Sequence, residues 1–203
     1  MDIIQTLTLQ LVINDLCESI SCNKLMFADD LKLYDSVSNI NDCIMLQQQI
    51  DLLQRWCLSN RLYLNIAKCK VLTFSRKTNT IFFSYVIDNT ILERTETIRD
   101  LGVHFDIHLT FNVHINLIVS QAYRTYGFIF RNCGNFTDVT ALSCLFFSLV
   151  RTKLEYGSLI WNPIYAQYTT AVERVQKKFL KFLSFKVDGV YPARGCNYFN
   201  LLA

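Results

Sequence analysis

The stretch Phe27-Ala28-Asp29-Asp30 lies between two short runs of alternating pattern, residues 24–27 and 31–34. The alternation predicts two strands, and the residues between them predict a tight turn, so we expect a hairpin that carries two adjacent carboxylates. Carboxylate oxygens are ligands that suit a hard cation such as Mg²⁺. Two such ions are one standard means of nucleotidyl transfer. The alternative is a solvated turn, because Asp tolerates turn geometry and bonds its own backbone.

The composition indicates a folded protein with a sizeable core. The chain has 203 residues, of which 51% are hydrophobic, and its net charge is +3. This length allows one large domain or two small ones, and the apolar content is too high for global disorder. So small a positive charge neither demands nor excludes a nucleic-acid partner.

The cysteines and the N-terminus favour a reduced, intracellular protein, in the nucleus or the cytoplasm. None of the eight Cys forms a Cys-x-x-Cys pair, and the three His do not follow with zinc-finger spacing. The start, Met1-Asp2, has no basic segment typical of a signal peptide. A secreted disulfide framework is the alternative. The longest apolar run is too short to span a bilayer, so we expect no membrane partner. The oligomeric state is left open.

Up to about residue 108 the pattern mixes strands with one long helix. Residues 41–58 place apolar side chains on one stripe, which predicts an amphipathic helix that begins at Asn41, with Asp42 in its first turn. Gln47, Gln48 and Gln54 fall on the opposite, solvated face. The remaining expectations are a buried helix or extended segment over 7–20 and strands over 62–65, 69–75, 81–87, 91–92 and 101–105, with a turn at 88–89.

Two lysines near the predicted strand 69–75 have two interpretations. Lys68 precedes this strand and Lys70 lies near its start. Lysine is common at exposed strand edges, where it blocks unwanted pairing, and spacing alone favours this interpretation. The functional alternative is a cation beside a triphosphate, which stabilises or protonates the leaving group.

From about residue 109 onward the pattern is helical. We expect three helices, over 110–131, 137–154 and 167–185, and we expect Thr110 to be the cap of the first. The third helix exposes a basic stripe, which we define as Arg174, Lys177, Lys178 and Lys181. Such a stripe can follow a phosphate backbone, or it can be a solvated face.

Read together, these residues resemble the C-terminal part of the reverse transcriptase of non-LTR retrotransposons, most closely the jockey-type elements of insects. Residues 27–34 resemble the third palm motif, the hairpin, and 11–16 the apolar stretch before it. Residues 52–70 resemble the fourth motif, a helix followed by a Lys-bearing loop, and 101–114 the junction of palm and thumb. The helical region that follows is matched by Leu154-Glu155-Tyr156-Gly157, Trp161-Asn162-Pro163 and residues 173–180.

The resemblance implies a fold and a reaction. The fold is α+β: a partial palm over 1–108, with an antiparallel sheet and a covering helix, then a helical thumb-like region over 109–186 and a tail over 187–203. The reaction is attack of a primer 3′-hydroxyl on the α-phosphate of a dNTP, copying an RNA template into DNA. Asp29 and Asp30 would then hold Mg²⁺, with Asp29 the firmer ligand, and Lys68 would be the phosphate-side cation.

The sequence also departs from the family pattern. It shows no first palm motif, which supplies a further metal-binding Asp, no fingers region, no Pro-Gln-Gly box and no endonuclease domain. Adjacent residues of one strand point to opposite faces, so one hairpin cannot hold two ions 3.5–4 Å apart. We therefore expect that this polypeptide alone does not polymerise DNA, and that its hairpin has an open edge, exposed apolar surface and poor solubility.

Three hypotheses follow. The chain is part of an active polymerase known from an incomplete gene model, a decayed non-catalytic copy, or a binding module that uses the helical region and the basic stripe on nucleic acid.

Overall fold

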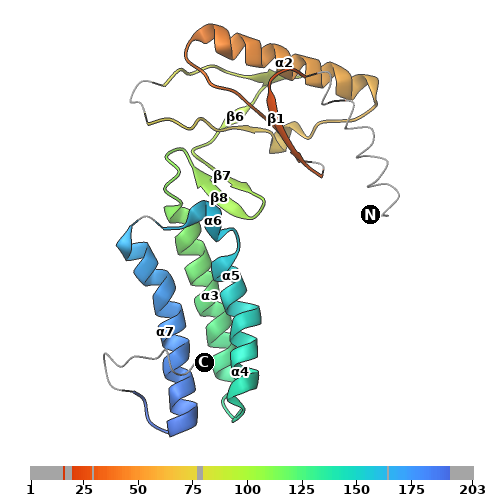
Figure 1. Cartoon of the computed structure of the whole chain (residues 1–203). Helices are drawn as coiled ribbons and strands as arrows, with labels where there is room; N and C mark the ends of the chain where they lie inside the picture. The colour runs from red at the N-terminus through yellow and green to blue at the C-terminus, as the bar shows by residue number, and fades with distance from the viewer. Residues whose placement is uncertain (1–15, 17–19, 29, 77–79, 164, 193–203) are drawn as a thin grey trace. The chain divides into compact units, whose positions relative to one another are not determined.

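The computed structural model describes residues 16, 20–28, 30–76, 80–163 and 165–192. Contacts divide the chain into two units, Met1–Glu96 and Thr97–Ala203, each with its own core. The first unit is mixed α and β, and the second consists of one hairpin and helices (Figure 1). The described residues contain no helix long and apolar enough to cross a membrane. The segment 7–20 lies outside the described residues, apart from Leu16 and Ile20.

The predicted hairpin is present. Strands β1 (Asn23–Phe27) and β2 (Asp30–Tyr34) pair antiparallel, with Phe27 opposite Asp30. Ala28 in the turn has a φ of 54°, in the left-handed region that such tight turns require. Within the described residues these two strands form a sheet of their own. Its outer face exposes Leu25 and Tyr34 as well as Phe27, so the expected apolar surface is there.

Helix α2 (Ile40–Ser59) holds the first unit together. It begins one residue before the predicted Asn41, because the N-cap is Asn39. The Asn39 side chain accepts from the Asp42 backbone, and Asp42 caps Asn39 in return. The buried stripe of α2 divides between two cores. Leu53 and Cys57 pack with Leu16, Ile20 and the β2 residues Leu31 and Leu33, and Cys43 and Ile50 pack with Tyr85 and Ile87.

The polar face of α2 is not simply solvated. The Gln47 side-chain amide donates to the Val86 carbonyl at 2.8 Å and accepts from the Val86 N–H at 2.9 Å. Gln54 accepts from the Asp88 N–H at 3.2 Å. Only Gln48 of the three predicted solvent-facing glutamines is fully exposed without such a bond. The Gln47 and Gln54 side chains therefore attach α2 to the strand and turn that follow Tyr85.

Of the other strands of the first unit, those predicted over 69–75 and 81–87 are only two residues long, the one predicted over 91–92 is shifted by one residue, and β6 (Glu93–Arg94) was not predicted. Strand β4 (Val86–Ile87) pairs with β5 (Thr90–Ile91) across the predicted turn, where Asp88 and Asn89 both have positive φ. Strand β3 (Lys70–Val71) pairs in parallel with β6 (Glu93–Arg94). The predicted strand 62–65 was wrong: this segment is irregular and leads into the 3₁₀ helix η1 (Ile66–Lys68). Each sheet in the described part of the first unit is thus a single pair of strands.

The second unit begins with a hairpin. Strands β7 (Thr97–Asp100) and β8 (Val103–Asp106) pair antiparallel, and residues 101–102 form the turn instead of starting a strand. The helices follow (Figure 1): α3 (Asn112–Asn132), α4 (Val139–Phe146), the π-helical turn η2 (Phe147–Arg151), α5 (Thr152–Glu155), α6 (Ser158–Trp161) and α7 (Ala166–Asp188). The predicted helix 137–154 is therefore present as one continuous helical segment from α4 through η2 to α5, called the α4–α5 rod below. Helix α6 was not predicted.

The core of this unit lies between α3, the α4–α5 rod and α7. Phe146 and Phe179 stack at its centre with ring centroids 4.0 Å apart. The rest of the fully buried set is aliphatic: Ile115, Ala122, Ile129, Leu142, Val150, Val175 and Leu183. This packing fixes the face of α7 that looks outward.

The N-cap position of α3 is Phe111, one residue after the predicted Thr110, whose hydroxyl accepts from the N–H of Asn112, the first helical residue, at 3.4 Å. The turn before the helix is held by Asp106. Its carboxylate accepts hydrogen bonds from the N–H groups of His108, Thr110 and Phe111 and from the Thr110 hydroxyl, at 2.7–3.1 Å. Burial raises the pKa of Asp106, but these hydrogen bonds outweigh burial and lower the pKa below its usual value. Phe111, the residue before the helix, has a φ of 57°, so the Asp106 carboxylate that accepts from its N–H stabilises a strained turn.

The β7–β8 hairpin is fastened to the helices by the segment Tyr156–Trp161. The Tyr156 hydroxyl donates to the Leu101 carbonyl at 2.7 Å, and Trp161 Nε1 donates to the Tyr156 carbonyl at 2.7 Å. Gly102 must be glycine here, since its φ is +88° and a Cβ would lie 3.1 Å from the Tyr156 ring. Buried His114 of α3 completes the contact against Trp161, with ring centroids 5.4 Å apart.

Candidate functional site

Of the two predicted carboxylates, the structure describes only Asp30. Asp29 lies outside the described residues. Asp30 is the first residue of β2, and its side chain is exposed beside the turn. Its cross-strand partner Phe27 is also exposed, so this carboxylate faces solvent.

The predicted metal site cannot be assembled from the described residues. Among them no group of three or more His, Cys, Asp or Glu side chains lies close enough to hold a metal ion. Mg²⁺ is commonly held by one or two carboxylates, with waters completing its octahedral shell. Asp30 is the one predicted Mg²⁺ ligand among the described residues.

The two lysines near β3, Lys68 and Lys70, have different contacts. Lys68 ends the 3₁₀ helix η1 and is exposed, and no hydrogen bond or ion pair joins its side chain to Asp30. Lys70 is the first residue of β3, and its Nζ lies 3.2 Å from Glu93 of the paired strand β6. Lys70 therefore has the structural role of a cross-strand ion pair, whereas Lys68, which is also exposed, has no ion pair with a described residue.

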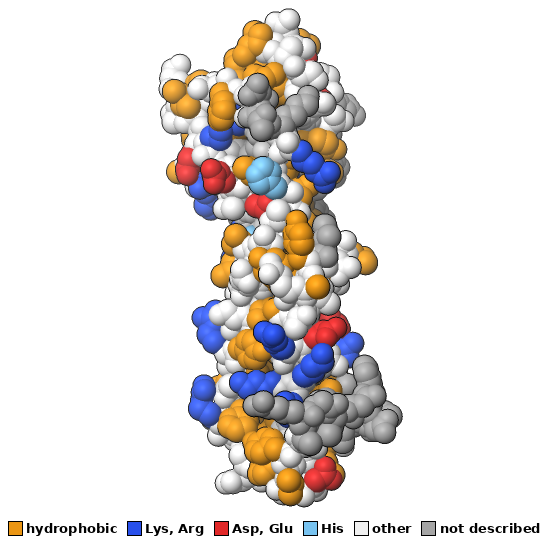
Figure 2. All heavy atoms as spheres, turned by 90° about the vertical axis from the view of Figure 1, so that its left-hand side faces the viewer, with side chains coloured by type: hydrophobic (Ala, Val, Ile, Leu, Met, Phe, Trp, Pro, Cys, Tyr) orange, Lys and Arg blue, Asp and Glu red, His pale blue; other side chains and the backbone are white. Residues whose placement is uncertain are grey.

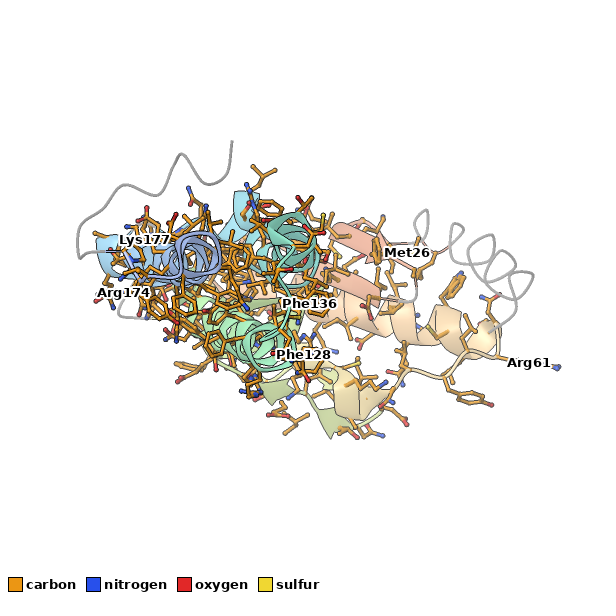
Figure 3. The ribbon with its side chains drawn as sticks, turned by 90° about the horizontal axis from the view of Figure 1, so that it is seen from below. Met26, Arg61, Phe128, Phe136, Arg174 and Lys177 are labelled. Carbon is orange, nitrogen blue, oxygen red and sulfur yellow. The ribbon has the colours of Figure 1, made fainter. Side chains whose placement is uncertain are left out.

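The predicted basic stripe lies on α7, and its members point in different directions. Arg174 and Lys177 are exposed on the side of α7 turned away from α4 (Figure 3). Lys177 is paired with Glu173 at 2.9 Å, so part of its charge is compensated. Lys178 points toward α3 instead: its Nζ lies 5.4 Å from the ring centroid of Tyr123 and 5.6 Å from that of Tyr126. Lys181 is half-buried.

The structure adds residues of α3 that the sequence interpretation missed. A shallow groove of about 480 Å³ runs between α3 and α7, and a second of about 760 Å³ continues along α3. Tyr123, Gly127 and Arg131 line both, Arg124 lines the second, and Lys178 lines the first. The spacing 124, 127 and 131 on the predicted helix was the available signal, because residues three, four and seven apart share one helix face.

Tyr126 forms the buried wall of this groove. Its hydroxyl donates to the Lys178 carbonyl at 3.4 Å, which fastens α3 to α7. Burial raises the pKa of Tyr126 to about 12, with a smaller contribution from Tyr191, so the hydroxyl keeps its proton at neutral pH. The positive charge around the groove is therefore not offset by a phenolate.

Lysine and arginine side chains gather on this part of the helical unit, with hydrophobic side chains between them (Figure 2). Arg124, Arg131, Arg174 and Lys178 form no ion pair with a carboxylate of the described residues. A surface of uncompensated cations interleaved with aromatic rings is typical of proteins that bind nucleic-acid strands.

Comparison of the chain with models of known protein families, with curated proteins and with solved structures finds no match in any of the three.

Proposed function

We propose that the chain is the palm-and-thumb part of a reverse transcriptase of the non-LTR retrotransposon class. The observation that carries the proposal is the ordered set of motifs in the sequence, from the Phe27-Ala28-Asp29-Asp30 hairpin to the Tyr156-Gly157 and Trp161-Asn162-Pro163 boxes. Any one box is weak evidence, but the same order and spacing over about 175 residues is improbable by chance. The antiparallel β1–β2 hairpin and the α2 helix that packs on it lend support.

In the complete enzyme the hairpin carboxylates Asp29 and Asp30 would bind Mg²⁺ together with a carboxylate from another strand, and Lys68 would stabilise the leaving phosphates. The hairpin supplies carboxylates from one place in the fold, and two-metal chemistry needs carboxylates from more than one place. We therefore expect no polymerase activity from the 203-residue chain alone. Its partners in the complete enzyme are an RNA template, a DNA primer and a dNTP, inside the cell.

The basic stripe of α7 is the proposed contact to the template and primer. Arg174 and Lys178 carry uncompensated charge, and both lie on one helix. Helix α7 continues unbroken for 23 residues, long enough to present these cations to several phosphates. Lys177 and Lys181 would add to the charge from neighbouring positions.

The test is a primer-extension assay on an RNA template with Mg²⁺ in two arms. The chain alone should give no product. The chain joined in frame to the fingers and first palm motif of a jockey-type enzyme should give template-dependent product, and Asp29→Asn should abolish that product. Asp35→Asn, at an exposed carboxylate just after β2, is the matched control and should leave extension unchanged.

Each arm can contradict the proposal. Template-dependent product from the chain alone would refute the need for a partner carboxylate. Product that survives Asp29→Asn would remove the metal role of the hairpin. If the joined protein is inactive while the same N-terminal part is active with its own C-terminal part, the chain is a decayed copy.

A further inference from the structure

The groove between α3 and α7 has the chemistry of a site for unpaired nucleotides. Its floor and walls are aromatic, since Tyr123, Tyr126 and Phe130 line it. Its rim is cationic, since Arg131 and Lys178 line the same groove and no acidic side chain of the described residues does. Arg124 extends the cationic rim along α3.

Gly127 keeps the groove open. It lies in the middle of α3, where glycine costs about 1 kcal/mol relative to alanine, and it lines both parts of the groove. A Cβ at this position would project into the groove and lie 3.3 Å from an Arg131 guanidinium nitrogen. The glycine therefore lets a ligand approach the helix backbone and leaves Arg131 in place beside it.

The two arginines are placed to contact more than one phosphate. They are seven residues apart on one helix, so their Cα atoms are separated by about 10 Å along the axis. Both are exposed, and neither pairs with a described carboxylate. Lys178 holds its charge over the Tyr123 and Tyr126 rings, so cation and aromatic surface are adjacent.

Aromatic side chains distinguish single strands from duplexes. In a duplex the faces of the bases are covered by their neighbours, whereas an unpaired base can stack on a tyrosine or phenylalanine ring. Tyr123 is half-exposed and Phe130 is exposed, so their rings are accessible for stacking. A duplex would contact the arginines and leave these rings unused.

We propose that the α3–α7 groove binds a single-stranded segment of nucleic acid, with bases stacked on Tyr123 and Phe130 and phosphates held by Arg124, Arg131 and Lys178. The inference rests on the proposed function in that it names the form of the nucleic-acid partner. It assigns this role to α3 together with Lys178 of α7, apart from Arg174 and Lys177 on the outward side of α7.

The test measures fluorescence anisotropy of a labelled 12-nucleotide single strand and of a 12-base-pair duplex, titrated with the full chain at several salt concentrations. Tyr123→Ala should weaken single-strand binding about tenfold and leave duplex binding unchanged, because stacking contributes on this scale per base. Tyr123→Phe keeps the ring and should bind like the unaltered chain. Arg124→Gln with Arg131→Gln should reduce the salt slope of single-strand binding by up to about 1.4, because each phosphate contact contributes about 0.7.

Arg55→Gln with Arg61→Gln, two exposed arginines of the first unit, is the matched charge control and should leave the Tyr123-dependent preference intact. Circular dichroism of each variant checks that the helices are retained. Equal loss of single-strand and duplex binding in Tyr123→Ala, or no loss of either, would overturn the proposal. This proposal and the extension test can fail separately. Groove-dependent binding by the chain, with no extension by the joined protein, contradicts only the polymerase assignment. Extension by the joined protein, with no groove-dependent binding, contradicts only this inference.

Discussion

Asp106 shows how a single side chain sets the geometry between a strand and a helix. Four hydrogen bonds converge on its carboxylate, three of them from backbone N–H groups of the turn before α3. The sequence suggested Thr110 as the cap, because Thr lies directly before the apolar pattern, and Thr110 does accept from the N–H of Asn112. Residue type alone could not show that the chain folds back so that Asp106 binds the amides of the turn.

We predict that Asp106→Ala lowers the free energy of unfolding by about 1–3 kcal/mol, because several donors are left without an acceptor. Asp106→Asn should cost less, since an amide oxygen still accepts two of the bonds. Urea unfolding followed by circular dichroism measures both. The exposed Glu96, whose carboxylate has no hydrogen bond or ion pair with a described residue, provides the control Glu96→Ala. An Asp106→Ala variant as stable as the control would show that the turn does not depend on the carboxylate.

His114 is the buried histidine of the second unit. Its Nδ1 accepts from the His104 N–H at 3.4 Å, so the neutral ring carries its proton on Nε2, which has no partner among the described residues. Burial lowers the pKa of His114, and the neighbouring His104 lowers it further. The folded state thus binds the extra proton less readily than the unfolded state.

Stability should therefore be fully present above the unfolded pKa of about 6.5 and should fall as the pH drops below it, because only the unfolded chain takes up the proton there. His114→Phe should remove this part of the pH dependence, and the exposed His108→Gln should not. Urea unfolding at pH 7.5, 6.5 and 5.5 measures the slope. An unchanged slope in His114→Phe would assign the acid sensitivity to other groups.

The long helices were predictable and the short strands were not. Helices α2, α3 and α7 begin and end within three residues of the expected positions, because helical periodicity is a local signal over many residues. The parallel pair β3–β6 joins residues 23 apart, and only two residues of each strand pair. Nothing local marks such a pairing. The segment 62–65 has a strand-like pattern, but its side chains Leu62 and Leu64 pack under α2 without a partner strand.

Gln47 was predicted to be solvent-facing and instead replaces a strand partner. Its amide bonds both the N–H and the C=O of Val86, as a neighbouring strand would. Gln47→Ala should therefore lower the free energy of unfolding of the first unit by about 1–2 kcal/mol, because two backbone groups lose their partner. Gln48→Ala, one position along on the exposed face, should change it by less than about 0.5 kcal/mol. Equal effects of the two changes in urea unfolding would contradict this role.

Across the whole molecule, the candidate site was only partly predictable. The sequence identified the exposed Asp30, Lys68 and the cations of α7, because residue type and spacing are visible in one dimension. It missed the α3 contribution, since Tyr123, Arg124 and Arg131 join Lys178 only when α3 packs against α7. The boundary between the units also differs: contacts divide the chain after Glu96, and the sequence pattern changed at residue 108, because the β7–β8 hairpin packs with the helices.

The assignment to a reverse transcriptase is tested most directly by the nucleotide sequence that lies directly 5′ of this coding segment, translated in its three forward frames. The proposal predicts a fingers region, a first palm motif with its Asp and a Pro-Gln-Gly box, in that neighbourhood and in the family's order. One open frame would indicate an active polymerase, and stop codons or frameshifts between the same motifs would indicate a decayed copy. Absence of these motifs from all three frames would contradict the assignment.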